Sequence, residues 1–368
     1  MPNRYGSICK SVLISTAIFV LRSTSYAQTS GNKNGLVSTL GRLAESAARG
    51  YVAPIVSGFG ADLNSGWVES VPPPVIASLD IKLGIVGMGS FFSPSSKSFD
   101  AQGTFEFNHN QADLLIPRSY TGALRDSIRS EIMKIPFNVT IAGPTIVGSK
   151  LDTIAVRFGG GTATVNYSGT KQSVNLNPLV VSTGVTGFLE NLRLLPMGAF
   201  QFSAGTILGT DVSVRFLPTS SINSKLGNTS YFGFGIQHDP LVWFGSPVPL
   251  NLSLAYFTQT LKIGSVFKST ASEFGIYASK TFGPGLLNIT PFAGFSFESS
   301  KMNISYDFQT TGPLNQPISV PVSFSLTGEN VTSITIGFSL RMLYAVNISV
   351  GYDVAKYNSA CLGVGIEI

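Results

Sequence analysis

Few residues in this 368-residue sequence could carry out chemistry. It contains only two histidines and two cysteines. His238 precedes Asp239, a pair that could suggest a general base beside its orienting carboxylate. Adjacent residues on a strand face opposite sides of a sheet, however, so these two cannot act as a dyad. His109 lies in the polar stretch Asn-His-Asn-Gln, which is typical of a loop tip.

The sequence also lacks the spacing patterns of known catalytic, metal and cofactor sites. No cysteine–histidine cluster has the spacing of a zinc site. Gly159-Gly160-Gly161 lacks the Gly-Lys-Ser/Thr ending of a phosphate-binding loop. Cys361, next to Leu362, is expected to pack as a small hydrophobic side chain. We therefore predict that the protein is not an enzyme and has no catalytic residue, no metal site and no cofactor.

Asp211 and Arg215 are the charged residues with the most informative spacing. They lie four apart in a segment where Val212, Val214 and Phe216 alternate with them. On a strand they share one face, which in a membrane barrel would be the lumen. Two roles are open for these candidate lumen-lining residues. They could form a constriction that selects solutes, or a structural ion pair or network.

The element that would position them is a β-strand, and strands dominate the sequence. Residues 334–368 alternate almost without a break: Ile334, Ile336, Phe338 and Leu340 alternate with Thr335, Gly337, Ser339 and Arg341, and the pattern continues through Val350 to Ile368. Such strands have one apolar and one polar face, as in a membrane barrel. Many segments are near the 9–11 residues of a tilted spanning strand. We predict an all-β fold, an antiparallel transmembrane β-barrel of about 12–14 strands over residues 77–368.

Departures from alternation mark other expected elements. A change of phase at Val86 predicts a bulge or a bend in the first strand. Helical spacing of Leu36, Leu40, Leu43, Ala47 and Tyr51 predicts a short amphipathic helix, and Leu124, Ile128 and Ile132 predict another. The glycine-rich stretch 53–67 is expected to be a loop. Residues 28–76 form an N-terminal helical and loop segment, placed either in the lumen as a plug or on the periplasmic side.

The first 27 residues have the features of a secretory signal peptide. Arg4 and Lys10 precede an apolar run over residues 11–21, and Ser25 and Ala27 suit a cleavage site. Cleavage after Ala27 would remove three basic residues, Arg4, Lys10 and Arg22, and would lower the net charge from +5 to +2. The basic pI therefore gives no argument for binding of nucleic acid. Only 12% of the residues are charged and mean hydropathy is +0.28. These features predict export to the outer membrane.

Several short blocks of the sequence are distinctive when taken together. They are Tyr51-Val52-Ala53-Pro54, Asn64-Ser65-Gly66-Trp67, Pro144 to Gly148, Leu208 to Pro218, Gly233 to His238, and Gly363-Val364-Gly365-Ile366. With these blocks the chain resembles an uncharacterised family of exported, outer-membrane β-barrel-like proteins of Gram-negative bacteria. The resemblance covers nearly the whole mature chain and implies the barrel architecture but no assigned activity. In layout alone, the helical preamble is similar to that of uptake barrels for hydrophobic compounds.

Three functions are compatible with this sequence. The first is a passive channel or uptake path for small or hydrophobic compounds. The second is a non-transporting barrel with a structural or surface-interaction role. The third is a secreted soluble β-sandwich or lipid-binding protein, which the low charge disfavours. Expected partners are outer-membrane lipids and the barrel assembly machinery, with no nucleic acid. The solute, the exact strand number, the state of the lumen and the oligomeric state are left open.

Overall fold

A computed structural model describes residues 33–187, 189–190, 192–223, 227–245, 249–284, 286–311 and 317–368. The signal peptide expected over residues 1–27 lies outside the described residues. None of the described helices is both long enough and apolar enough to cross a membrane.

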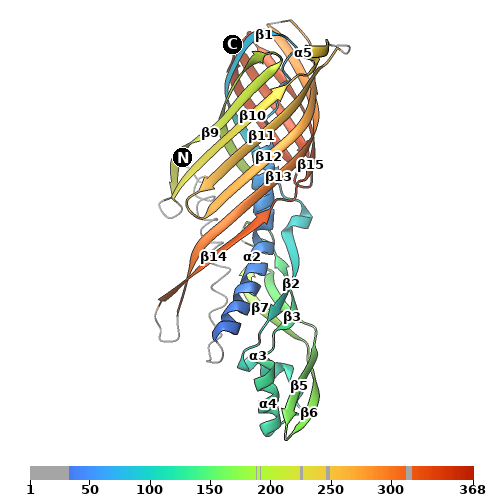
Figure 1. The fold of residues 1–368 in the computed structure, drawn as a ribbon, viewed down its shortest axis with the longest axis vertical. Helices are drawn as coiled ribbons and strands as arrows, with labels where there is room; N and C mark the ends of the chain where they lie inside the picture. The colour runs from blue at the N-terminus through green and yellow to red at the C-terminus, as the bar shows by residue number, and fades with distance from the viewer. Residues whose placement is uncertain are drawn as a thin grey trace.

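Ten antiparallel strands close into a barrel (Figure 1), which confirms the predicted fold class. Each strand of the wall pairs with the next wall strand along the chain, and the first wall strand pairs with the last, with Lys82 opposite Glu367. The strands are β1 (Ala77–Phe91), β8 (Leu194–Ile207), β9 (Thr210–Asn223), β10 (Gly227–His238), β11 (Asn251–Ile263), β12 (Phe267–Ser279), β13 (Leu287–Thr311), β15 (Thr332–Met342), β16 (Val346–Val354) and β17 (Ser359–Glu367). A short helix, α5 (Leu241–Phe244), joins β10 to β11.

The expected count of about 12–14 strands is too high, because residues 92–193 leave the barrel between β1 and β8. We call them the insert. Their strands have only 6 to 8 residues, too short to span a bilayer. The insert contains η1 (Pro94–Lys97), β2 (Ser98–Phe105), α3 (His109–Leu115), α4 (Gly122–Ile132), β3 (Phe137–Pro144), β4 (Thr153–Phe158), β5 (Gly161–Tyr167), β6 (Thr170–Leu176) and β7 (Leu179–Thr186).

The insert strands and helices pack around hydrophobic residues that are continuous with those around α2, and α4 is the second amphipathic helix that the sequence predicts. Ile128 and Ile132 on α4 are fully buried, and the rings of Phe107, Phe137 and Phe158 all contact one another. Residues 77–368 are therefore not one continuous barrel. β14 (Pro317–Thr327) also lies outside it, since it pairs only with the second half of β13 beyond the closed wall.

The barrel wall is apolar outside and polar inside over much of its height. On β15, Ile334, Ile336 and Phe338 point outward with 41–52% exposure, whereas Ser333 and Thr335 point inward with 9% or less. The same alternation holds on β16 and β17. We call these outward apolar positions the apolar belt. Hydrocarbon is the environment in which a barrel exposes such a surface.

At one end of the barrel this polarity reverses. On β11, outward residues change from Leu254 and Tyr256 to Thr258 and Lys262, while Leu261 points inward. We call this end the insert rim, because the insert leaves from it. The other end, where β1 begins and the chain ends at Ile368, is the terminal rim. Beyond the belt the barrel therefore has a polar exterior and an apolar interior.

Helix α2 (Lys33–Asn64) explains the apolar interior. It runs from beside the insert into the barrel (Figure 1). The expected helix over 36–51 is found, but the loop expected over 53–67 is wrong, because α2 continues past Gly50 and Pro54 to Asn64. Any side chain at Gly50 would clash with the Phe99 ring, and one at Gly60 with the Ser300 hydroxyl. The glycines allow close packing rather than ending the helix.

An arginine in the apolar belt should destabilise the barrel. Val350 lies on the outward face of β16 opposite Phe338, and we expect Val350→Arg to lower the free energy of unfolding by about 2–4 kcal/mol. Urea titration of the barrel folded into lipid vesicles measures this change. Thr258→Arg, outward but beyond the belt, is the control and should cost about 0–1 kcal/mol. Equal losses at both positions would contradict the assignment of the belt to lipid.

Candidate functional site: a filled barrel lumen

The barrel lumen is the site where most buried polar side chains meet. It holds the last turns of α2 and the segment that follows, residues 55–71, which we call the plug. Trp67, Val68 and Val71 of the plug are at most 4% exposed and form an apolar cluster with Phe257 and other wall residues. The plug then leads to the terminal rim, where β1 begins.

Arg215 holds the plug to one wall. Its side chain, on β9, is fully buried. Its Nε donates to Oε1 of Gln201 at 2.6 Å, and its two terminal nitrogens donate to the backbone carbonyls of Ser65, at 2.8 Å, and Gly66. The guanidinium also lies 4.1 Å from the centre of the Trp67 ring. Arg215 therefore recognises the plug backbone and its indole together.

Asp353 holds the same plug residue to the opposite wall. The Ser65 hydroxyl donates to Oδ2 of Asp353 at 2.6 Å. Two wall hydroxyls, Thr335 at 2.7 Å and Ser359 at 3.0 Å, donate to the same carboxylate. Ser65 is thus tied through its carbonyl to β9 and through its hydroxyl to β16. A buried carboxylate is tolerated when hydrogen bonds satisfy it in this way.

Asn64 adds a second pair of ties. Its Oδ1 accepts from Nε2 of Gln259 on β11 at 2.6 Å, and its Nδ2 donates to Glu298 on β13 at 3.4 Å. The plug residues 64–66 therefore bond to four separate strands of the wall.

Trp67 fills the remaining width of the lumen. It stacks on Phe257 with ring centres 5.0 Å apart, and its Nε1 donates to the Leu63 carbonyl at 3.0 Å. Gly233 and Gly235 on β10 lie beneath the indole. A Cβ at Gly233 would lie 2.8 Å from the Trp67 ring, and one at Gly235 would lie 2.5 Å from the Phe257 ring. The glycines of the Gly233-Phe234-Gly235 sequence on β10 therefore leave the space in which the Trp67 ring packs.

Asp211 and Arg215 both lie on the inner face of β9, but the structure does not bring them together. No ion pair joins them in the described part of the chain, and Oδ1 of Asp211 has no hydrogen-bond partner there. Asp211 lies nearer the terminal rim and lines a small cavity with Lys82, Glu69 and Gln237. Of the two roles that the sequence left open, the arrangement of Arg215 is that of a structural network.

A group of charges surrounds the plug at the terminal rim. Nζ of Lys82 donates to Ser70 Oγ at 2.9 Å and lies 3.7 Å from Asp80 and 3.9 Å from Glu367. Glu367 also pairs with Arg341 at 3.1 Å. Lys82 thus links the end of the plug to the first and last strands, at the seam where the barrel closes.

Two small cavities between the plug and the wall are seen at this end in the described part of the chain. One is lined by Lys82, Asn347 and Gly365 and the other by Trp67, Asp211 and Gln237, and each has a volume of about 10 Å³. A single water molecule needs about this much space. Neither cavity offers a path for a larger solute.

The remaining reactive side chains do not form a site. His238 accepts from Trp243 Nε1 at 3.2 Å and contacts the Thr210 hydroxyl at 2.9 Å, while Asp239 accepts from the backbone of Leu241 and Leu252. Cys361 is free and packs against Gly66 and Gly351. Within the described ranges, no group of three metal-ligating side chains is present. The expectation that the chain is not an enzyme stays a prediction.

The insert contains a charge cluster that predicts an acid-sensitive step. Hydrogen bonds from Arg125 and Arg129 lower the pKa of Asp113 from 3.8 to about 2. Because the folded pKa is depressed, this carboxylate stabilises the insert above pH 3.8, and its contribution is lost as the pH falls towards 2. Pepsin cleavage of Asp113→Asn should exceed that of wild type at pH 4, and the difference should shrink towards pH 2. Glu131→Gln, in an exposed pair with Lys134, is the control and should resemble wild type.

Sequence reasoning missed the residues that hold the plug. Ser65, Gly66 and Trp67 lie in a block that was expected to be a loop, and Gln201 and Asp353 looked like ordinary inward strand positions. The signal that could have found them is the combination of a tryptophan after small polar residues with a Gly-x-Gly strand. Glycines in a strand leave room for another group to approach the backbone closely, and a buried tryptophan is a side chain large enough to fill that room.

The model of a family of unknown function, DUF6588, matches residues 8–368. No curated protein matches the chain at a significant level. Similar solved structures include the N-terminal β-barrel of Pseudomonas aeruginosa OprF, with 15% identity over 43% of this chain and 94% of that one, TM-score 0.20. The Escherichia coli outer membrane protease OmpT has 8% identity over 80% of this chain and 96% of that one, TM-score 0.27. The translocator domain of the Neisseria meningitidis autotransporter NalP has 10% identity over 90% of this chain and 99% of that one, TM-score 0.21. At these values none of them bears on the function of this chain.

Proposed function

This chain belongs to the DUF6588 family of unknown function, and we propose that it is an outer-membrane barrel that anchors and displays its insert instead of conducting solutes. The observation that carries the proposal is the filled lumen. Plug residues 64–66 are bonded to four strands of the wall, and the cavities beside the plug have about 10 Å³ each. This favours the non-transporting function over the passive channel or uptake path.

The apolar belt supports a membrane location, and the connections support an orientation. At the terminal rim, the longest connection between wall strands, from β10 to β11, has 12 residues. At the insert rim, the connection between β1 and β8 is the whole insert. Bacterial barrels have short periplasmic turns and longer extracellular loops. By this rule the terminal rim faces the periplasm and the insert is held at the cell surface, in contact with outer-membrane lipids after insertion by the barrel assembly machinery.

The helix α2 gives the insert a rigid mounting. Tyr51 of α2 donates to the Thr186 carbonyl of the insert at 3.0 Å, and Ile146 donates to the Tyr51 carbonyl at 2.9 Å. Ala48, Tyr51 and Ile55 belong to one hydrophobic cluster with the insert core and the barrel residues Leu261 and Ile263. The insert is thus continuous with the barrel through packed side chains, as a display role requires.

Surface labelling tests the orientation. In a Cys361→Ser background, a membrane-impermeant maleimide should label Lys171→Cys, exposed on the insert, in intact cells. Tyr344→Cys, exposed at the terminal rim, is the matched variant and should be labelled only after the cells are opened. The reverse pattern would place the insert in the periplasm and overturn the display function.

Bilayer recording tests the closed lumen. The purified full-length protein, inserted in a planar bilayer, should show no stable single-channel current, and vesicles that carry it should not swell in sugar solutions. Steady wild-type conductance would instead support the channel function.

A further inference from the structure

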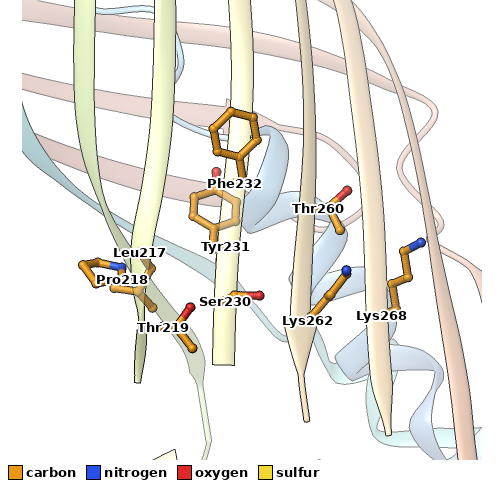
Figure 2. A pocket seen from close by; sticks show the side chains of 9 residues that line it. All are labelled: Leu217, Pro218, Thr219, Ser230, Tyr231, Phe232, Thr260, Lys262 and Lys268. Carbon is orange, nitrogen blue, oxygen red and sulfur yellow. The ribbon is translucent and has the colours of Figure 1, made fainter. Parts of the chain in front are cut away.

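A basic pocket lies on the outer surface of the barrel near the insert rim. It has a volume of about 480 Å³ and is formed by the ends of β9 to β12 (Figure 2). Lys262 and Lys268 line one side, and Phe232, Leu217 and Pro218 line the other. Figure 2 shows both lysine side chains directed along the strands, towards the end of the view at which Phe232 lies. None of these residues belongs to the plug.

Lys262 and Lys268 form a pair of positive charges with no carboxylate beside them in the described part of the chain. Lys262 and Lys268 face each other directly across β11 and β12, and both are exposed. Lys301, on β13, points outward opposite Thr270 of β12. β10 and β11 contain no acidic residue, and the one carboxylate of β12, Glu273, is buried inside the barrel. In the described part of the chain, no carboxylate lies within ion-pair distance of these lysines. Two like charges this close favour a shared anion.

The height of the pair on the barrel indicates where that anion comes from. Going from the apolar belt towards the insert rim, paired rows cross β11, β12 and β13. An aromatic row of Tyr256, Phe274 and Phe297 is followed by a hydroxyl row of Thr258, Ser272 and Ser299, and then by the lysines. Aromatic residues collect at the membrane interface, and basic residues just beyond it meet the headgroups.

We propose that Lys262 and Lys268 bind the phosphates of a lipid headgroup in the outer leaflet, with lipid A as the lipid class. The assignment to the outer leaflet rests on the orientation in the proposed function. A doubly phosphorylated headgroup supplies the anions for the lysine pair, and the exposed Phe232 ring gives its acyl chains an apolar contact. The hydroxyls of Thr260 and Ser230 lie at the same pocket and can hydrogen-bond to the sugar or phosphate oxygens.

Native mass spectrometry of the full-length protein in non-ionic detergent, titrated with lipid A, tests the site. The double variant Lys262→Gln/Lys268→Gln should bind lipid A about 30-fold more weakly than wild type, from about fivefold per lysine. Wild type should bind dephosphorylated lipid A as weakly as the double variant binds lipid A. Lys280→Gln, at the terminal rim with its Nζ over the Phe282 ring, is the control and should bind like wild type. Heat-modifiable gel mobility confirms that each variant is folded.

Three results would overturn the proposal. Unchanged lipid A affinity of the folded double variant would remove the site. An equal loss in Lys280→Gln would show general attraction instead of a specific pocket. Displacement of lipid A by equimolar inorganic pyrophosphate would make it a site for free phosphate. The maleimide labelling of Lys171→Cys tests orientation by itself, so a missing lipid site and a reversed barrel give different results.

Discussion

Arg215→Ala should lower the free energy of unfolding by about 3–5 kcal/mol, because it leaves several buried polar groups without partners. Gln201 and the carbonyls of Ser65 and Gly66 would lose their donors, and Trp67 would lose the guanidinium beneath its ring. The void and the free carbonyls would also admit water beside the plug. Thermal unfolding in detergent, followed by circular dichroism and by heat-modifiable gel mobility, measures the loss.

A second arginine provides the comparison for Arg215. Arg341 pairs with Glu367 at the terminal rim and its side chain is 32% exposed. Arg341→Ala should therefore cost no more than about 1 kcal/mol. Arg215→Lys keeps the charge but cannot donate to three acceptors at once from a planar group, and we expect it to lose most of the stabilisation. If Arg215→Ala is no less stable than Arg341→Ala, Arg215 does not hold the plug.

Removing the plug should produce the largest change in conduction. Deleting residues 33–71 leaves all ten wall strands and empties the lumen of Asn64, Ser65 and Trp67. An eight-stranded barrel is just filled by its own side chains, so a ten-stranded wall with small inward serines leaves a narrow aqueous path. Single-channel recording in planar bilayers should then show stable openings that the wild type lacks.

A milder variant tests the plug even if the deletion does not fold. Gly233→Leu keeps the whole chain but places a side chain where the Trp67 indole sits, at 2.8 Å for the first added carbon. It should displace Trp67 and give intermittent openings. Gly159→Leu, in an open turn of the insert, is the matched control and should stay closed. Closed recordings from both the folded deletion and Gly233→Leu would show that something other than the plug seals the barrel.

The barrel class was predictable because its signal is local. Inward and outward residues alternate with a period of two within each strand. The pattern in residues 334–368 therefore predicts which side chains form the apolar belt, whichever strands pair with them. The number of wall strands was not predictable in this way. The insert strands alternate too, but they alternate around a core outside the barrel wall, and only their short length separates them from spanning strands.

The filled lumen could not be read from local patterns, since it depends on contacts between distant segments. Val86 and the residues after it illustrate this. The change of phase there was expected to mark a bulge or a bend, and the pairing of β1, unbroken from Asp80 to Phe91, excludes the bulge. Val86 and Met88 are simply apolar residues that point inward, because the plug lies against them. Glycines of α2 likewise lower helix propensity locally but suit a helix enclosed by a wall.

The pairing of β1 with β17 has a consequence for the opening of the barrel. These strands are the first and last of the wall, so the barrel becomes a closed ring only when the end of the chain has been made. At the terminal rim, β1 follows the plug directly along the chain, so the plug is tethered to one of the two strands that form this seam. Ser65 is bonded to β9 on one side of the seam and to β16 on the other. The plug therefore crosslinks the two flanks of the seam and should slow its opening, so the barrel should resist unfolding longer with the plug than without it.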